Sequence, residues 1–151
     1  MRLRGCGHRF HQNCINEWCQ QRHKCPLCNA AIGTVFGNGP ATGTMSWRLI
    51  HTRLGGFTRA DTDKAIEINF SFPPGVHANG QQHQNQRYDA RSETAYLPFN
   101  EMGVTLWRLY QIAFTRKSMF GIGWRHMGGG YAPIFQIHIR TSTSPGEHGW
   151  P

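Results

Sequence analysis

A cluster of cysteines and histidines near the start of the chain constrains the fold more than any other feature of the sequence. All five cysteines lie between Cys6 and Cys28. Six side chains follow the pattern C-x-H-x2-H-x2-C-x10-C-x2-C, namely Cys6, His8, His11, Cys14, Cys25 and Cys28. Thiolates and imidazoles suit tetrahedral zinc, and short spacings let two ligands reach one ion from a tight turn. The pattern predicts a zinc module over residues 1–32.

Metal binding would supply the folding energy of this module. A segment of about thirty residues buries too little apolar surface to fold without a metal or cross-links. A disulfide scaffold would spread its cysteines along the chain to join distant loops, whereas these are clustered among histidines. The clustering favours metal over disulfides, and it favours a reducing compartment. We therefore expect the protein in the cytosol or the nucleus.

The rest of the chain predicts a loop and then a second domain. Residues 33–44 are rich in Gly, Thr and Pro and predict a linker. Residues 45–151 contain segments of both strand and helix character. In residues 65–72 the apolar side chains alternate with polar ones, which indicates a half-buried strand, and residues 45–49 alternate in the same way.

Residues 100–114 have helical spacing instead. Asn100 is a suitable N-cap, and the apolar stripe is expected to comprise Leu106, Leu109, Tyr110 and Ala113. Residues 118–122 and 134–139 indicate two further strands. An order of two strands, one helix and two strands predicts an α+β fold, with a small metal module followed by a mixed α/β domain.

The sequence carries a large excess of positive charge. It has 16 Lys and Arg against 8 Asp and Glu, a formal charge of +8. Such an excess favours an anionic partner such as nucleic acid, phosphate or an acidic protein surface, although a basic surface with no specific anion is the alternative. No apolar run approaches the roughly 18 residues of a membrane span, so no membrane partner is expected.

The stretch CGHRFHQNCINEWCQQRHKCPLC resembles a RING finger of the RING-H2 kind. Eight ligands in that family hold two zinc ions in a cross-braced arrangement. The resemblance implies one complete site, made by Cys6, His8, Cys25 and Cys28. His11 and Cys14 would be half of the other site, and no earlier C-x-x-C lies in the sequence to complete it. We therefore expect one well-formed zinc site and weak ubiquitin transfer, while a zinc-ribbon-like site without ligase activity is the alternative.

The same resemblance implies a surface for a ubiquitin-conjugating enzyme. In RING fingers that enzyme contacts the Trp of the central helix and the Pro of the last C-P-x-C, which correspond to Trp18 and Pro26, and Leu27 would extend the patch. Core packing is the alternative role for Trp18. Cys19 fits no ligand position and is expected to be a small core residue on the helix.

Residues after the RING-like stretch resemble the C-terminal domain of the Deltex family. The matching segments are GNGP at 37–40, HQN at 83–85, TAYLPFNEMG at 94–103, MFGIG at 119–123, IHIRT at 137–141 and HGWP at 148–151. The resemblance implies a RING-type E3 ubiquitin ligase whose C-terminal domain binds NAD and ADP-ribose, with a role in Notch signalling. Its partners would be a ubiquitin-conjugating enzyme, ubiquitin and ADP-ribosylated proteins.

The resemblance also implies where ADP-ribose binds. It assigns His138, His148 and Trp150 to the ligand, and Arg140 would add charge. Cationic donors suit a pyrophosphate, and an aromatic face suits a base. The family's catalytic glutamate follows the H-G-Y-P segment, and Glu147 falls outside that register. We therefore expect binding of ADP-ribose without processing of NAD.

Two other functions are compatible with the sequence. One is a non-catalytic adaptor that recognises ADP-ribosylated proteins, and the other is a basic, zinc-containing protein that binds nucleic acid. Nucleic-acid binding is possible but not favoured, because the basic residues form no run. Salt dependence separates it from the others, since affinity for nucleic acid falls steeply as salt rises.

Overall fold

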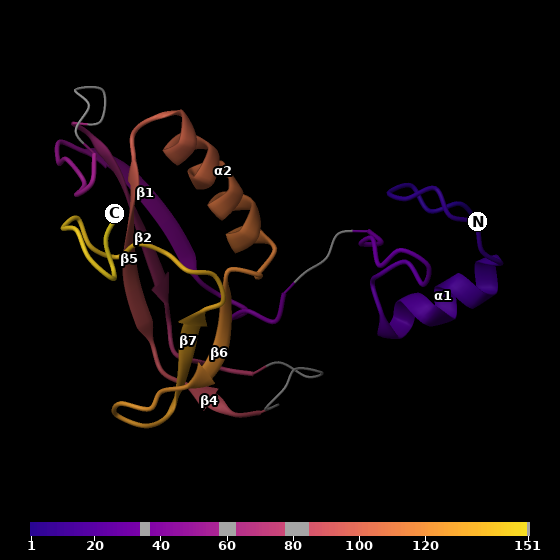
Figure 1. The fold of residues 1–151 in the computed structure, drawn as a ribbon. Coiled ribbons are helices and arrows are strands. Elements are labelled where there is room, and N and C mark those ends of the chain that lie inside the picture. The colour runs from indigo at the N-terminus through magenta and orange to yellow at the C-terminus, as the bar shows by residue number, and fades with distance from the viewer. Residues whose placement is uncertain (34–36, 58–62, 78–84, 151) are drawn as a thin grey trace. The chain divides into compact units, whose positions relative to one another are not determined.

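The chain folds into two compact units, Met1–Phe36 and Gly37–Pro151 (Figure 1). The structure, a computed structural model, describes residues 1–33, 37–57, 63–77 and 85–150. The division between the units falls inside the segment predicted as a linker. Helices and sheets both occur, which confirms the predicted α+β class. In the part of the chain that the structure describes, no helix has the length and apolar character needed to cross a membrane.

The first unit is built around the helix α1 (Gln12–Gln21). Among the described residues of this unit, the buried core consists of Leu3, Ile15 and Cys25. Cys19 packs against this core at one helical turn from Ile15, as its spacing predicts. A core of this size cannot by itself offset the conformational entropy lost on folding, so a further source of stability is needed.

The described residues of the second unit form two sheets and one helix (Figure 1). The first sheet is antiparallel with the order β1-β2-β5, from β1 (Thr44–Ile50), β2 (Ala65–Phe72) and β5 (Arg91–Pro98). The second sheet has the order β3-β4-β7-β6, from β3 (Gly75–Val76), β4 (Arg87–Tyr88), β7 (Tyr131–Phe135) and β6 (Phe120–Trp124). The alternation predicted for β2 is confirmed, because Ile66, Ile68, Phe70 and Phe72 are buried.

Phe70 joins the layers of the second unit. Its ring lies 5.8 Å from that of Phe114 on the helix, 5.1 Å from that of Phe120 on β6 and 6.0 Å from that of Phe135 on β7, measured between centroids. These distances are typical of favourable aromatic pairs. The hydrophobic core therefore lies where the first sheet, the helix and the second sheet meet.

The helix α2 (Glu101–Thr115) begins as the sequence predicts, but its buried face differs. The Asn100 side chain accepts a hydrogen bond from the Gly103 N–H at 2.9 Å, which confirms Asn100 as the N-cap. The prediction for Leu109 is wrong, because this side chain is 54% exposed. The face that packs on the core is centred on Tyr110 and Phe114, and Leu109 lies about 120° away around the helix axis.

The strand predicted over residues 134–139 is also wrong beyond Phe135. The β7 strand ends there, and the chain bends away and runs along the free edge of β5, where the Tyr96 N–H donates to the Arg140 carbonyl at 2.9 Å. Ile139 is buried and His138 is exposed. The apolar alternation in this segment thus reflects burial against a neighbouring strand and not a continuous ladder of its own.

Candidate metal centre and C-terminal surface

Four predicted ligands meet in the first unit: Cys6, His8, Cys25 and Cys28. Their ligand atoms all lie within 4.8 Å of one another. The His8 Nδ1 atom is 3.4 Å from the Cys6 sulfur and 3.5 Å from the Cys25 sulfur. Tetrahedral zinc, with Zn–S about 2.3 Å and Zn–N about 2.0–2.1 Å, requires sulfur–nitrogen separations of about 3.5 Å. The four side chains therefore fit one zinc ion.

Tight turns aim these ligands at a common point. The turn before His8 has a left-handed residue at Gly7, with φ of 78°, and is closed by the Leu3 N–H donating to the His8 carbonyl at 2.9 Å. The second turn has a left-handed residue at Asn29, with φ of 57°, whose N–H donates to the Cys25 carbonyl at 2.9 Å. Glycine and asparagine adopt this conformation more readily than other residues, which explains their place beside the ligands.

The second turn also prepares Cys25 for metal binding. Burial raises the pKa of the Cys25 thiol, but hydrogen bonds from the backbone of Cys28 and Leu27 and from neighbouring thiols outweigh it and lower the pKa from 9.0 to about 6. For Cys28 the backbone of Ala30 lowers the pKa, but burial and the nearby Cys25 raise it overall. Zinc binds the thiolate, so the lowered pKa of Cys25 favours its ligating form.

The structure places His11 and Cys14 outside this group of four. His11 is the N-cap of α1 and Cys14 lies in its first turn, and both side chains are exposed. Within the described residues, neither belongs to a group of three or more side chains that could hold one metal ion. These two predicted ligands are therefore not brought together with a complete coordination set.

Trp18, Pro26 and Leu27 are exposed beside the metal centre. The Trp18 indole N–H donates to the Lys24 carbonyl at 2.7 Å, which holds the ring next to the turn that carries Pro26 and Leu27. The Arg22 guanidinium lies over the same ring, 5.3 Å from its centroid. Trp18 is 36% exposed and Leu27 69% exposed, so Trp18 is not a core residue, and an apolar patch faces solvent.

The predicted ADP-ribose residues lie on one folded-back segment of the second unit. The amides of Thr141 and Ser142 both donate to the His148 carbonyl, at 2.8 and 2.9 Å, and the Arg140 guanidinium donates to the Glu147 carbonyl at 3.1 Å. These bonds bring Arg140 close to the loop that carries His148. The side chains of His138 and His148 are exposed.

Trp150 has a structural role in the same region. Its indole N–H donates to the Tyr96 carbonyl at 2.8 Å, its ring meets that of Phe57 edge-on at 5.7 Å, and it packs against the core. Only the exposed part of its ring could stack on a ligand. His83, Gln84 and Pro151, which belong to two of the matched segments, lie outside the described residues.

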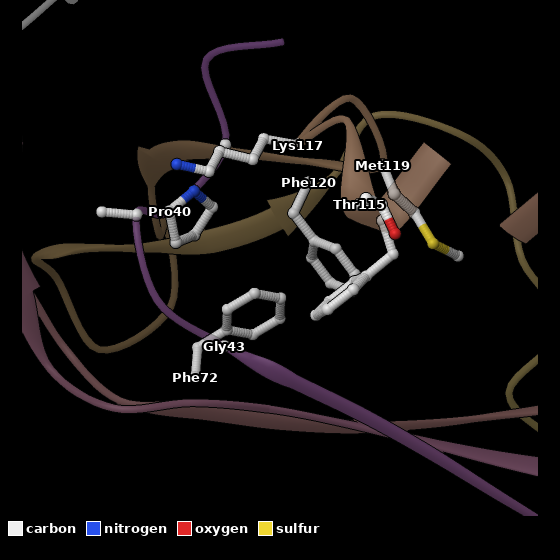
Figure 2. A pocket seen from close by; sticks show the side chains of 10 residues that line it. Pro40, Gly43, Phe72, Thr115, Lys117, Met119 and Phe120 are labelled. Carbon is white, nitrogen blue, oxygen red and sulfur yellow. The ribbon is translucent and has the colours of Figure 1, made fainter. Parts of the chain in front are cut away.

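Sequence reasoning missed a cavity of about 240 Å³ next to the C-terminal end of α2 (Figure 2). Its lining includes Pro40, Phe72, Phe114 and Phe120, with Lys117 at the rim. Phe114, Lys117 and Phe120 lie close together in the sequence, whereas Pro40 and Phe72 come from distant segments. No local spacing signals such a site, because only the tertiary fold brings these segments together.

Comparison with known proteins covers nearly the whole chain. A family model described as the Deltex C-terminal domain matches residues 36–151, and one described as a RING-H2 zinc finger domain matches residues 2–29. The Homo sapiens protein named "Probable E3 ubiquitin-protein ligase DTX3" is 32% identical over 99% of this chain and 44% of its own length. The Mus musculus "E3 ubiquitin-protein ligase DTX1" is 32% identical over 99% of this chain and 25% of its own length. The chain thus spans less than half the length of these relatives.

Proposed function

Because the chain belongs to the Deltex family and carries a RING-H2 zinc-finger module, we propose that it acts as a RING-type E3 ubiquitin ligase, which transfers ubiquitin from a conjugating enzyme. The observation that carries this proposal is the exposed Trp18 held beside a formed Cys/His cluster. A partly exposed Trp next to exposed apolar groups is typical of a binding hot spot. Zinc would supply the rigidity that keeps this patch in place.

In this proposal the first unit binds the conjugating enzyme and positions its ubiquitin thioester. Pro26 and Leu27 stand on the turn between two ligands, so their backbone would be fixed as soon as zinc is bound. The Trp18 ring is fixed by its bond to the Lys24 carbonyl. A patch that is ordered before binding loses less entropy when the partner docks, which favours productive encounters.

The Trp18→Ala variant tests the ligase function. We expect its rate of ubiquitin discharge from a charged conjugating enzyme to fall at least about tenfold, because a hot-spot Trp contributes on the order of 2 kcal/mol or more. Rates are compared as ratios, since the wild-type rate is expected to be low with His11 and Cys14 outside the cluster. Trp124→Ala is the matched control: this Trp is 54% exposed in the second unit and should leave the rate unchanged. Equal rates for Trp18→Ala and wild type would contradict the proposal.

We further propose that the second unit binds ADP-ribose, free or on modified proteins, through His138, Arg140 and His148. The support for this site is chemical. Two exposed imidazoles and a guanidinium on one folded-back segment offer hydrogen-bond donors to a pyrophosphate. The half-buried Trp150 ring would meet one of the rings of the ligand.

Isothermal calorimetry with ADP-ribose tests this second activity. His138→Ala should weaken binding at least about tenfold, as expected for loss of one charge-assisted hydrogen bond. His126→Ala, which removes another exposed histidine of the same unit, should bind like wild type. Absence of heat with the wild-type chain, or the same loss in both variants, would argue against the site. Binding of ADP-ribose without any ubiquitin discharge would identify an adaptor instead.

A further inference from the structure

The cavity beside the end of α2 is lined by phenylalanine side chains and by one lysine, Lys117 (Figure 2). Phe72, Phe114 and Phe120 line its interior. Figure 2 shows the Lys117 side chain beside Pro40, with Thr115 and Met119 on the other side of Phe120. The lining residues that the structure describes all belong to the second unit.

One wall of the cavity is a segment that is fixed to the helix end. The Gly37 N–H donates to the Arg116 carbonyl at 2.8 Å, and the Gly39 N–H donates to the Lys117 carbonyl at 3.0 Å. A Cβ atom at Gly39 would lie only 2.7 Å from the carbonyl oxygens of Lys117 and Phe120, so glycine is required for this close approach. The cavity is therefore formed before any ligand arrives, which reduces the entropy lost on binding.

Lys117 occupies a position where helices normally have glycine. The Ser118 N–H donates to the Ala113 carbonyl and the Lys117 N–H to the Phe114 carbonyl, each at 2.9 Å, which is the Schellman pattern at a helix C-terminus. Lys117 is the left-handed residue of this motif, with φ of 54°. Any residue other than glycine is strained in this backbone conformation. The presence of lysine therefore points to a role for its side chain.

The Lys117 ammonium is available to a ligand. The side chain is exposed, and among the described residues it forms no ion pair with a carboxylate. A second cavity of about 350 Å³ also reaches Lys117 and Phe120 and adds the polar residues Asn38, Ser118 and Gln136. A cavity with three phenylalanine rings in its lining and a second one with polar side chains in its lining thus adjoin at Lys117.

We propose that this cavity docks an acidic peptide segment of a partner protein, which inserts one large apolar or aromatic side chain and places a carboxylate against Lys117. The volume supports a single side chain. A cavity of about 150 Å³ holds benzene, whereas pockets for larger ligands usually have about 300–1,000 Å³. The second cavity, with Asn38, Ser118 and Gln136 in its lining, suits the hydrogen-bonding groups of the continuing peptide backbone. The formal charge of +8 favours an acidic partner over a basic one.

Amide NMR with the zinc-loaded, ¹⁵N-labelled chain tests the proposal with three synthetic peptides, acetyl-DDFDD-amide, acetyl-DDADD-amide and acetyl-KKFKK-amide. The first should shift the amide signals of Gly39, Gly43 and Lys117. The other two peptides should bind at least about tenfold more weakly. The alanine peptide lacks the aromatic side chain, and the lysine peptide carries a positive charge that Lys117 repels. Absence of shifts at these three amides, or equal binding of the alanine peptide, would overturn the proposal.

Two substitutions at Lys117 separate a binding role from a structural one. Lys117→Glu should weaken binding of the acidic phenylalanine peptide at least about tenfold. Arg108→Glu, the same charge change at an exposed site on α2, should change the affinity for this peptide less than about twofold. The Lys117→Gly protein should also bind the acidic phenylalanine peptide more weakly. Its melting temperature should be the same as that of wild type or higher, because glycine removes the strain of the left-handed conformation. Unchanged affinity in Lys117→Gly, or equal losses in the two glutamate variants, would show that Lys117 does not hold the peptide.

Discussion

Replacing Cys25 with serine is expected to release zinc and unfold residues 1–33 while the second unit stays folded. Cys25 is completely buried, belongs to the four-residue cluster and forms one third of the small core of the first unit. Serine is a poor zinc ligand, and structural zinc contributes about 10–16 kcal/mol of apparent binding energy in small fingers. That contribution exceeds what a core of three residues can supply, so no folded state of this unit should persist without the ion.

Zinc content by atomic emission and amide NMR together measure this outcome. We expect loss of bound zinc and collapse of the signals of the first unit into the narrow range of an unfolded chain, with the signals of the second unit in place. Cys19→Ser is the control, since Cys19 contacts the same core but lies outside the cluster, and it should keep zinc. A Cys25→Ser protein that retains one zinc per chain, or that loses both units together, would refute the assignment of the site and the independence of the units.

Gly103→Ala is expected to destabilise the second unit by about 1–3 kcal/mol or more. This change in the free energy of unfolding has the opposite sign to the usual one. Alanine within a helix is ordinarily more stable than glycine by about 1 kcal/mol. A Cβ atom at Gly103 would clash with the carbonyl oxygen of Pro98, the residue that ends β5 just before the helix. The Gly103 N–H is also bonded to the Asn100 cap, so the helix start cannot shift away without breaking that bond.

Denaturant unfolding followed by far-UV circular dichroism tests this prediction. Thr105→Ala, on the exposed side of the same helix, is the matched control and should change the free energy of unfolding by no more than about 0.5 kcal/mol. A Gly103→Ala protein as stable as wild type would mean that the approach of Pro98 to the helix is looser than the structure shows.

Local patterns in the sequence determined the parts of this protein that depend on neighbouring residues. The alternation over β2 identified its buried face, and Asn100 identified the start of α2, because both depend on backbone geometry within a few residues. The four clustered ligands of the first unit come from two tight turns, and the spacing within each pair already implies that both members can reach one ion. The resemblances to RING-H2 fingers and to Deltex C-terminal domains are likewise carried by the sequence and confirmed.

Only the tertiary structure decided which faces and edges are covered. Leu109 has helical apolar spacing yet is exposed, because the sheet meets the helix along Tyr110 and Phe114 instead. The segment after Phe135 leaves its strand because the edge of β5 offers a partner for its backbone at Arg140. Gly103 and Lys117 gain their roles from contacts with Pro98 and with the segment at Gly39, which are distant from any periodic signal. Burial is a property of two packed surfaces, and one segment of sequence describes only one of them.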